Sequence, residues 1–407
     1  MSHVIVVGGG HAAAQFCASM IEAGQGERVI LVSEEAHVPY QRPPLSKTYL
    51  KDPQPAPAWI RADSFYTGKG VDVRLSSRAV RIDRQARLLH LADGGALPYA
   101  HLVLATGTRA RTLPSLEAMA ANVHTLRTLD DAARLRQQAE SAQRVLVVGG
   151  GFIGLEIAAT LAAQGKQVTL LEAAPRLLAR SVSPEVSAFL LAHHRSRGVD
   201  VRLDAVVEGF EGDAQGVTGV RLADGQALPV DMVVVGIGAL PNDELAQEAG
   251  LDCDNGVVVD ESMQTSDPNI LAIGDCTAFP SHHLGRRVRL ESIQNANDQA
   301  RCAAAAVLGQ PQPYRALPWF WSDQGEVRLQ IVGLAQPQHE RVLRGNLADG
   351  KFAVLYFDGE VLTAVESINA PADHMAARKL VAAGQPVPRD AARDVAVPLK
   401  TLEAAAA

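Results

Sequence analysis

Residues 145–156 read VLVVGGGFIGLE, and residues 4–13 read VIVVGGGHAA. Each stretch is a short β-branched run that turns on three glycines and continues into an apolar or alanine-rich segment of helical character. A second apolar strand follows each of them, ending at Glu34 in VILVSE and at Glu172 in VTLLE. This order of strand, turn, helix and strand is typical of dinucleotide-binding βαβ units. The sequence therefore predicts two such units, whose first glycines lie 149 minus 8, or 141, residues apart.

The glycines of such a turn have separate functions. The first permits the tight turn, the second lets the backbone approach a pyrophosphate, and the third allows close helix packing, while the helix N-terminus offers N–H groups to the phosphates. Either motif alone could be a turn without a ligand, but two complete units in one chain argue against that reading. The predicted cofactor-binding positions are Gly8, Gly10 and Ala13 in the first unit and Gly149, Gly151 and Gly154 in the second.

An acid at the end of the second strand can accept hydrogen bonds from both hydroxyls of a ribose, and Glu34 and Glu172 occupy that place. A carboxylate at Glu172 would also repel a 2′-phosphate. The residues that follow it are two alanines and a proline, with Arg176 the first cation after them. The second unit is therefore predicted to prefer NADH to NADPH.

Composition restricts the classes of fold and function. The 407 residues exceed the roughly 250 at which single cores stop growing, and 47% hydrophobic residues with 34 glycines suit an α/β protein. A net charge of -7 argues against a nucleic-acid partner. No apolar run approaches the roughly 18 residues of a membrane span, and a strand begins at once after the N-terminus, so no membrane association and a cytoplasmic location are expected.

Further segments indicate how the chain is divided. Residues 101–108 and 231–242 read as strands that close the two units, and residues 269–276 should return to the first. After about residue 317 the sequence PWFWSDQ precedes alternating strand-like runs, typical of a small α+β domain. The prediction is an α/β protein with one dinucleotide-binding domain at 1–112 and 245–316, a second at 113–244, and a C-terminal domain at 317–401.

Eight motifs stand in order over nearly the whole chain: GGGHAA, YQRPPLSK, LVLATGTRAR, LRTLDDA, VVGGGFIGLE, MQTSDPNILAIGDC, LESIQNANDQA and PWFWSDQ. This set resembles the FAD-dependent NADH:ferredoxin reductase family, of the putidaredoxin reductase and biphenyl-dioxygenase reductase type. The resemblance implies a glutathione-reductase-like fold with two Rossmann-like domains, FAD in the first and NAD in the second. It also implies an oxidoreductase that passes electrons from NADH through FAD to a [2Fe-2S] ferredoxin serving a cytochrome P450 or a Rieske oxygenase.

The same resemblance implies roles for single residues. Glu34 should bind the adenosine ribose of FAD, Asp275 the ribityl chain, and Ile293 the pyrimidine end of the flavin through its backbone. Lys47 should reach the flavin ring, where a cation stabilises the anionic reduced form, and Glu156 should lie near the nicotinamide and pair with Lys47. The remaining cofactor positions that it implies are Ala12, in the pyrophosphate turn, Val80, and Arg127, on the adenine side.

The cysteines bear on where the electrons go. Cys17, Cys253, Cys276 and Cys302 are far apart and form no C-x-x-C pair, so neither a metal site nor a disulfide scaffold is indicated. Disulfide reductases of this fold need a cysteine pair after the first unit, and related oxidases need one cysteine near the flavin. Residues 34–47 contain none. The electrons should therefore pass to an external acceptor without a protein thiol.

Two of the three tryptophans, Trp319 and Trp321, lie in one short motif. A packed aromatic cluster is one interpretation. The resemblance instead places the motif near the flavin at the ferredoxin-docking surface, with Trp321 as the preferred catalytic contact. Since such ferredoxins are usually acidic, basic residues should surround the exit. The candidates are Arg301 and Lys400, followed by a denser group at Arg286, Arg287 and Arg289.

Three other functions remain open. A rubredoxin reductase or an NADH oxidase would share both dinucleotide sites, although the missing cysteine argues against the oxidase. A redox-responsive binding protein that resembles apoptosis-inducing factor is the third, and the absence of targeting segments and basic runs argues against it.

Overall fold

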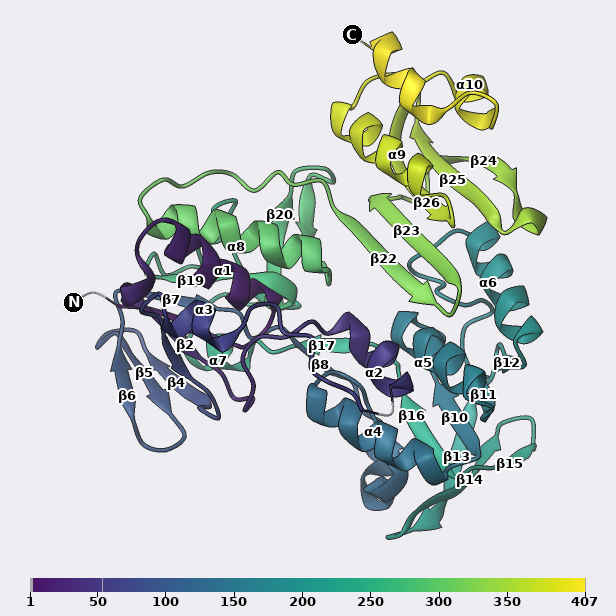
Figure 1. The fold of residues 1–407 in the computed structure, drawn as a ribbon, viewed down its shortest axis with the longest axis horizontal. Helices are drawn as coiled ribbons and strands as arrows, with labels where there is room; N and C mark the ends of the chain where they lie inside the picture. The colour runs from purple at the N-terminus through teal and green to yellow at the C-terminus, as the bar shows by residue number, and fades with distance from the viewer. Residues whose placement is uncertain (1–2, 53, 407) are drawn as a thin grey trace. The chain divides into compact units, whose positions relative to one another are not determined.

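The computed structural model describes residues 3–52 and 54–406. The chain forms two compact units, which Figure 1 shows coloured along the sequence. The first comprises Met1–Gln41, Pro57–Arg109 and Leu240–Pro318, and the second comprises Arg42–Ala56, Ala110–Ala239 and Trp319–Ala407. The division into three domains at the boundaries given above stays a prediction.

A five-stranded parallel sheet forms the centre of the first unit, in the order β19-β7-β1-β2-β3. Every side chain of β1 and β2 is buried, as expected for a parallel sheet covered on both faces, and this explains their continuous apolar runs. Strand β19 pairs with β7, so residues 269–276 return to this sheet as predicted. The strands are β1 (Val4–Val7), β2 (Val29–Val32), β3 (Asp72–Arg74), β7 (His101–Leu104) and β19 (Ile270–Ala272).

Helices α1 (His11–Glu22) and α8 (Ile293–Val307) lie side by side in the first unit (Figure 1). Their facing surfaces are rich in alanine, including Ala13 and Ala300, which have no measurable exposure, and small side chains let the two backbones approach closely. The unit also contains β4 (Ala79–Asp83), β5 (Leu88–Leu91), β6 (Ala96–Pro98), β18 (Val257–Val258), β20 (Thr277–Ser281), β21 (Arg286–Val288), α3 (Asp63–Thr67) and α7 (Glu244–Glu248). The chain passes between the units at β8 (Thr108–Ala110) and β17 (Ala239–Pro241).

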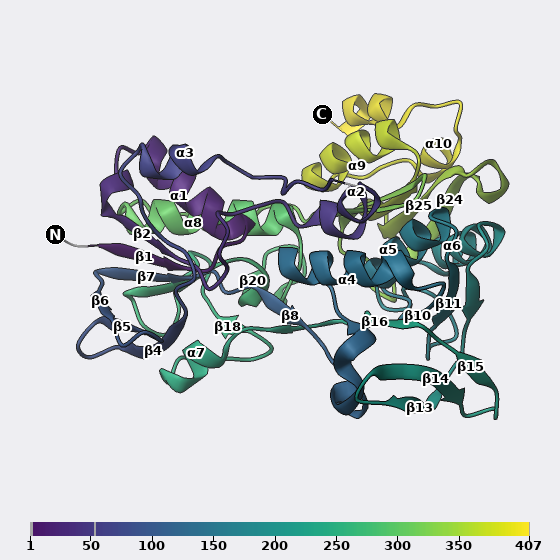
Figure 2. The same cartoon turned by 60° about the horizontal axis from the view of Figure 1, so that its bottom comes forward.

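A second five-stranded parallel sheet, in the order β12-β11-β10-β16-β9, lies in the second unit. Helix α4 begins at a capping box in which Thr128 and Asp131 satisfy each other's backbone N–H groups. Figure 2 shows an antiparallel ribbon of β13, β14 and β15 in the same unit. The elements are β9 (Val123–His124), β10 (Arg144–Val148), β11 (Gln167–Leu171), β12 (Asp200–Arg202), β13 (Val207–Asp213), β14 (Gly216–Leu222), β15 (Ala227–Pro229), β16 (Met232–Val235), α2 (Thr48–Lys51), α4 (Leu129–Ser141), α5 (Phe152–Ala163) and α6 (Pro184–Ser196).

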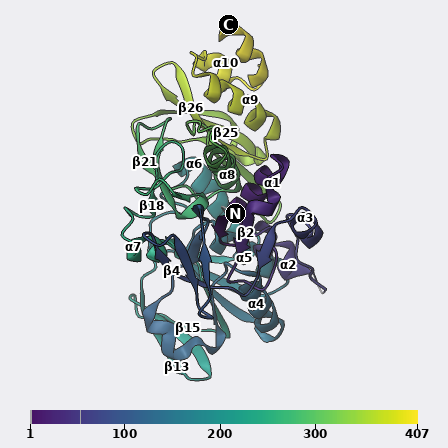
Figure 3. The same cartoon turned by 90° about the vertical axis from the view of Figure 1, so that its left-hand side faces the viewer.

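The C-terminal part of the second unit is an antiparallel sheet in the order β22-β23-β26-β25-β24. Helix α9 packs on β23 and β26, and α10 packs on β24. Figure 3 shows α9 beside β26. Gly384 ends α9 in the left-handed conformation, at a φ of 61°. The elements are β22 (Trp319–Gln324), β23 (Val327–Gly333), β24 (Glu340–Asn346), β25 (Lys351–Asp358), β26 (Val361–Ile368), α9 (Pro371–Ala383) and α10 (Arg389–Arg393).

Within residues 3–52 and 54–406, no helix combines the length and the apolar character needed to cross a membrane.

Candidate functional site

The first glycine turn, between β1 and α1, leaves space where a phosphate group would lie. Gly8 has a φ of +125°, and a Cβ atom there would come within 2.1 Å of the Ala105 carbonyl oxygen, so only glycine fits. Gly10 is different, because a Cβ atom there would meet nothing within 4 Å. The Ala14 N–H donates to the Gly10 carbonyl at 3.0 Å. The N–H groups before Ala14, in the first turn of α1, have no intrahelical acceptor. Open space beside such N–H groups is the geometry that binds a pyrophosphate.

The polar residues after β2 differ in position from those after β11. Val7 pairs with Val32, so Ser33 follows β2 directly and Glu34 lies one residue further on. The Ser33 hydroxyl is buried without a hydrogen-bond partner among the described residues. The Glu34 side chain is 71% exposed, and one of its oxygens lies 3.6 Å from Arg78 Nε. An unpaired buried hydroxyl beside an exposed carboxylate suits a ligand that carries ribose hydroxyls, although the role of Glu34 stays a prediction.

The turn that carries Asp275 lies against the start of α1. Gly274 has a φ of +80°, and a Cβ atom there would be 3.1 Å from the Cβ atom of Ala12. The side chain of Gln299 fixes this turn, since its Oε1 accepts hydrogen bonds from Gly274 N at 2.7 Å and from Thr277 Oγ1 at 3.0 Å. The Nε2 group of Gln299 is a second buried donor without a partner among the described residues. Unpaired groups of this kind beside a glycine cradle fit FAD.

The other residues predicted at the FAD site also fall in this unit, except two. Ile293 is the first residue of α8, and the Ser292 hydroxyl caps that helix by accepting from Asn295 N at 3.1 Å. Val80 lies on β4 with 40% of its surface exposed. The first unit holds Gly8, Gly10, Ala12, Ala13, Glu34, Val80, Asp275 and Ile293, whereas Lys47 and Arg127 belong to the second.

The second glycine turn, between β10 and α5, repeats the first. Gly149 has a φ of +109°, and a Cβ atom there would lie 2.4 Å from the Gly236 carbonyl oxygen. At Gly154 a Cβ atom would come within 2.1 Å of the Gly149 oxygen, so the third glycine allows the helix to pack against its own turn. Gly151 is open, with Gly236 O at 3.7 Å as the nearest neighbour. This turn therefore also provides a phosphate cradle, which fits NAD.

The carboxylate of Glu172 is held at the end of β11. Its Oε2 accepts from Gly150 N at 2.7 Å, and its Oε1 accepts from Ala174 N at 2.8 Å. The cation considered from the sequence, Arg176, points its guanidinium at two carbonyls of the following loop, Val182 O at 2.7 Å and Ala179 O at 2.5 Å. Arg176 thus stabilises this loop. The carboxylate of Glu172 lies beside the glycine turn.

Lys47 and Glu156 form the predicted ion pair, with Lys47 Nζ 2.6 Å from Glu156 Oε2. The pair is largely buried, because its side chains are 19% and 6% exposed. Lys47 also donates to Pro43 O at 3.1 Å. The same carboxylate accepts from Ser46 Oγ at 2.5 Å and, through Oε1, from Ser322 Oγ at 2.7 Å. The sequence analysis did not identify either serine. Their only signal in the sequence is that Ser46 precedes Lys47 and Ser322 follows Trp321 in the two motifs.

Arg127 lies just before α4, where its backbone is fixed from two directions. Arg42 Nη1 donates to Arg127 O at 2.7 Å, and Arg127 N donates to Asp131 Oδ2 at 3.1 Å. Arg42, from YQRPPLSK, is therefore a further residue that the sequence analysis missed. The assignment of Arg127 to the adenine side of FAD stays a prediction.

The tryptophans of β22 form an aromatic cluster with α9. Trp319 and Trp321 stack with their rings 5.6 Å apart, and the Arg378 guanidinium lies 4.6 Å from the Trp319 ring. The His374 ring is 6.1 Å from that of Trp319, and both of its nitrogens are buried without partners among the described residues. Burial, assisted by Arg378, lowers the pKa of His374 to about 4. The cluster therefore carries one cation, Arg378, and a neutral imidazole at pH 7.

The basic residues proposed for acceptor docking differ in exposure. Arg301 is 55% exposed and pairs with Asp298 at 2.6 Å, and Lys400 is exposed. Arg289 does not belong to an open basic patch, since its side chain is 12% exposed and pairs with Glu291 at 2.6 Å.

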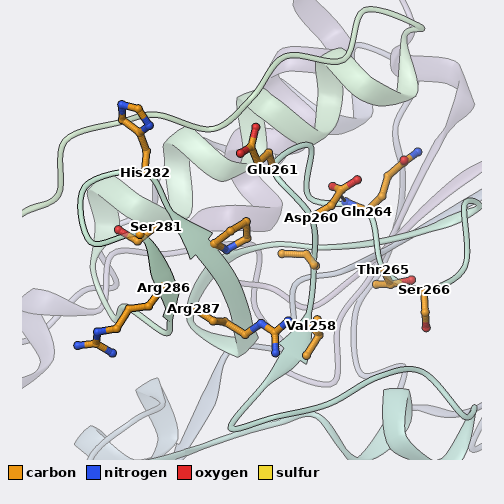
Figure 4. A pocket seen from close by; sticks show the side chains of 13 residues that line it. Val258, Asp260, Glu261, Gln264, Thr265, Ser266, Ser281, His282, Arg286 and Arg287 are labelled. Atoms are coloured by element: carbon orange, nitrogen blue, oxygen red, sulfur yellow. Dashed lines mark hydrogen bonds between the residues drawn. The ribbon is translucent and has the colours of Figure 1, made fainter.

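Arg286 and Arg287 line a cavity of about 730 Å³ in the first unit (Figure 4). Arg286 points away from the other lining side chains, whereas Arg287 extends toward Val258. Acidic Asp260 and Glu261 line the same cavity, so its charge is mixed. None of the residues predicted to bind cofactor lines it.

The structure does not support a redox function for the cysteines. All four are free thiols, and Cys17 and Cys276 are buried. Burial raises the pKa of Cys17 to about 12 and those of Cys253 and Cys302 to about 11. A thiol with so high a pKa is not a nucleophile at neutral pH.

Two family models together match most of the chain. Residues 2–300 match the pyridine nucleotide-disulphide oxidoreductase family, and residues 319–403 match the reductase C-terminal domain. Putidaredoxin reductase from Pseudomonas putida is 42% identical over 410 residues, covering 99% of this chain and 97% of that protein. Rhodocoxin reductase from Rhodococcus erythropolis is 42% identical over 398 residues, covering 98% and 93%.

Solved structures agree with the sequence matches. The ferredoxin reductase for the CYP199A2 system from Rhodopseudomonas palustris superposes with a TM-score of 0.95 at 43% identity, covering 100% of both chains. The reductase in a covalent putidaredoxin reductase–putidaredoxin complex also has a TM-score of 0.95, at 41% identity, covering 100% of this chain and 99% of that one. The predicted α/β fold is confirmed, and the chain belongs to the pyridine nucleotide-disulphide oxidoreductase family, among its FAD-dependent ferredoxin reductases.

Proposed function

We propose that this enzyme takes a hydride from NADH at its second glycine turn and delivers the electrons, through FAD, to two molecules of a [2Fe-2S] ferredoxin. That ferredoxin would serve a cytochrome P450 or a Rieske oxygenase. The observation that carries the proposal is the pair of glycine turns, in which Gly10 and Gly151 each leave open space at the end of a parallel sheet. FAD, when bound, supplies the conversion between hydride uptake and single-electron release. The chain supplies binding, orientation and charge.

Lys47 is the cation that we propose for the flavin side. Its ammonium group is fixed by Glu156 Oε2 and by Pro43 O, so it is preorganised rather than a mobile surface lysine. A fixed positive charge of this kind stabilises negative charge that develops beside it. Glu156 lies on the first turns of α5, directly after the glycine turn, and we propose that it acts close to the nicotinamide.

We further propose a preference for NADH over NADPH. The two backbone donors at Glu172 hold its carboxylate at the place where the adenosine ribose of NAD should lie. A 2′-phosphate there would meet a negative charge, and Arg176 is occupied by two backbone carbonyls. The same carboxylate would accept hydrogen bonds from the ribose hydroxyls of NADH.

Replacement of Glu172 by alanine should reduce the ratio of kcat/KM for NADH to that for NADPH by about tenfold or more. The variant loses an acceptor for the ribose hydroxyls and also loses repulsion of the phosphate. Steady-state reduction of a fixed acceptor with each cofactor measures the ratio. Glu208→Ala, an exposed acid on β13, is the control and should leave it unchanged. Equal use of both cofactors by the unmutated enzyme would contradict the proposed preference.

We propose that ferredoxin docks around Trp319 and Trp321, with Arg301 and Lys400 among the basic residues that attract it. The support is the exposure of the two cations and the position of both indoles on one face of β22. A solved relative, putidaredoxin reductase, was crystallised in covalent complex with putidaredoxin.

Charge reversal at Arg301 or Lys400 should slow ferredoxin-dependent turnover severalfold at low salt, with a smaller defect as salt is added, because encounter is steered by charge. Trp321→Ala should slow turnover as well, since it alters packing at the acceptor. Stopped-flow measurement should find bleaching of the flavin by NADH almost unchanged in all three variants. Arg221→Glu, on β14, is the charge-reversal control. Bleaching impaired as strongly as turnover would refute the assignment of these residues to acceptor recognition.

The alternative functions are less well supported. Residues 34–47 contain no cysteine, which argues against an oxidase that uses one near the flavin. The similarity to the ferredoxin reductase for the CYP199A2 system argues for ferredoxin rather than rubredoxin as the acceptor. A cytoplasmic location stays a prediction from the sequence.

A further inference from the structure

Strand β22 uses its two faces for different purposes. Because side chains alternate along a strand, Trp319 and Trp321 point to one face while Phe320, Ser322 and Gln324 point to the other. The tryptophan face carries the cluster with His374 and Arg378 of α9. The opposite face is buried against other parts of the second unit, since Ser322 and Gln324 are 1% and 0% exposed.

The buried face of β22 contacts the helix that follows the second glycine turn. The Phe320 ring lies 4.6 Å from that of Phe152, and the Ser322 hydroxyl donates to Glu156 Oε1 at 2.7 Å. Phe152 and Glu156 are four residues apart on α5 and therefore share one face of that helix. The strand and the helix thus meet at two successive points, one apolar and one polar.

The polar contact completes the hydrogen bonding of a buried carboxylate. Glu156 is 5% exposed, and its Oε2 accepts from Lys47 Nζ and Ser46 Oγ. Among the described residues, Ser322 is the donor that the structure gives to Oε1. A buried carboxylate oxygen without a donor is costly, so a glutamate that lost Ser322 would turn toward its remaining donors. Such a turn would bring both oxygens into competition for Lys47 and displace its ammonium group.

We propose that Ser322 is a positioning residue for the Lys47–Glu156 pair. Through it, the sheet that carries the acceptor-side tryptophans also fixes the carboxylate of the hydride half-reaction. The inference rests on the proposed function, because it takes Glu156 to act beside the nicotinamide. The contact is made by the strand face opposite the tryptophans, so it is compatible with Trp321→Ala sparing hydride transfer.

Two variants of the same shape test the hydroxyl. Ser322→Thr keeps the hydroxyl, whereas Ser322→Val replaces it with a methyl group. If these larger side chains disturb folding, Ser322→Ala removes the hydroxyl without adding volume. Ser367→Ala is the control, since that serine is equally buried in the same sheet and donates to Gln330 O at 3.2 Å. In stopped flow with the holoenzyme, we expect bleaching by NADH within about twofold of wild type for Ser322→Thr and Ser367→Ala, and roughly tenfold slower for Ser322→Val and Ser322→Ala.

A double-mutant cycle separates positioning from general packing. In the Glu156→Gln background, Ser322→Val and Ser322→Thr should bleach at the same rate, because the carboxylate that the hydroxyl positions is gone. Denaturant unfolding of the same variants gives a readout independent of activity, and Ser322→Val and Glu156→Gln should be coupled there rather than additive. Equal rates for the Thr and Val variants in the wild-type background, or a difference that persists with Glu156→Gln, would overturn the inference. If Glu156→Gln alone bleaches at the wild-type rate, the proposed role of Glu156 fails, and the inference fails with it.

Discussion

Gly10→Val should yield a folded protein that purifies without colour. The backbone at Gly10 is extended, with a φ of −98° and a ψ of −169°, a conformation open to residues other than glycine, and the first of the atoms that valine adds, its Cβ, would meet nothing within 4 Å in the protein. They would, however, fill the space from which the first N–H groups of α1 face a pyrophosphate. We expect the affinity for FAD to fall by at least about a hundredfold, which corresponds to roughly 3 kcal/mol of binding free energy.

Visible absorbance of the purified variant and FAD titration of the apoprotein measure this loss. Circular dichroism and thermal unfolding of variant and wild-type apoproteins show whether the fold is retained. A yellow Gly10→Val variant with normal affinity would place the pyrophosphate elsewhere and would refute the assignment of FAD to the first glycine turn.

Gly151→Val should produce the complementary defect, a yellow protein that NADH does not bleach. Its backbone is also extended, with a φ of −81° and a ψ of 177°, and a Cβ atom would have Gly236 O at 3.7 Å as its nearest neighbour. The valine would block the dinucleotide phosphates at the second turn while leaving the first unit intact. The rate of anaerobic bleaching at a fixed, subsaturating NADH concentration should fall by about a hundredfold or more.

The matched control for Gly151→Val is Gly209→Val. Gly209 lies on β13 of the same unit, in open space and without a positive φ, so the substitution adds the same side chain away from the turn. It should bleach at the wild-type rate. Normal bleaching by Gly151→Val, or loss of FAD from that variant, would contradict two separate dinucleotide sites.

The sequence predicted the parts of this molecule that local chemistry determines. The glycine turns were recognisable in the sequence because only glycine is possible at three of their positions. Gly8 and Gly149 have a positive φ, and Gly154 allows close helix packing. The buried strands β1 and β10 could be read because parallel strands covered on both faces are continuously apolar. The Lys47–Glu156 pair was predicted from a family resemblance, and the structure confirms it at 2.6 Å.

The features that the sequence did not reveal depend on contacts between distant segments. Ser46 and Ser322 lie 110 and 166 residues from Glu156 along the chain, and nothing in their own motifs names the carboxylate that they bind. The alternation in PWFWSDQ indicates that β22 has two faces, but it does not say that α5 covers one of them. Strand register places Ser33 at the end of β2, one residue before Glu34. A run of apolar residues does not determine that register, so the sequence alone did not reveal this position. The sequence predicts Arg289 as part of a basic patch, but in the structure it pairs with Glu291.

The central claim is that electrons run from NADH through FAD to an iron–sulfur acceptor. Anaerobic stopped flow of the holoenzyme with NADH and a panel of purified [2Fe-2S] ferredoxins tests it most directly, because flavin and ferredoxin absorbance are followed in one experiment. The account predicts rapid flavin bleaching by NADH, followed by reduction of two molecules of at least one acidic ferredoxin for each NADH consumed. Bleaching of the flavin without reduction of any ferredoxin in the panel would contradict it.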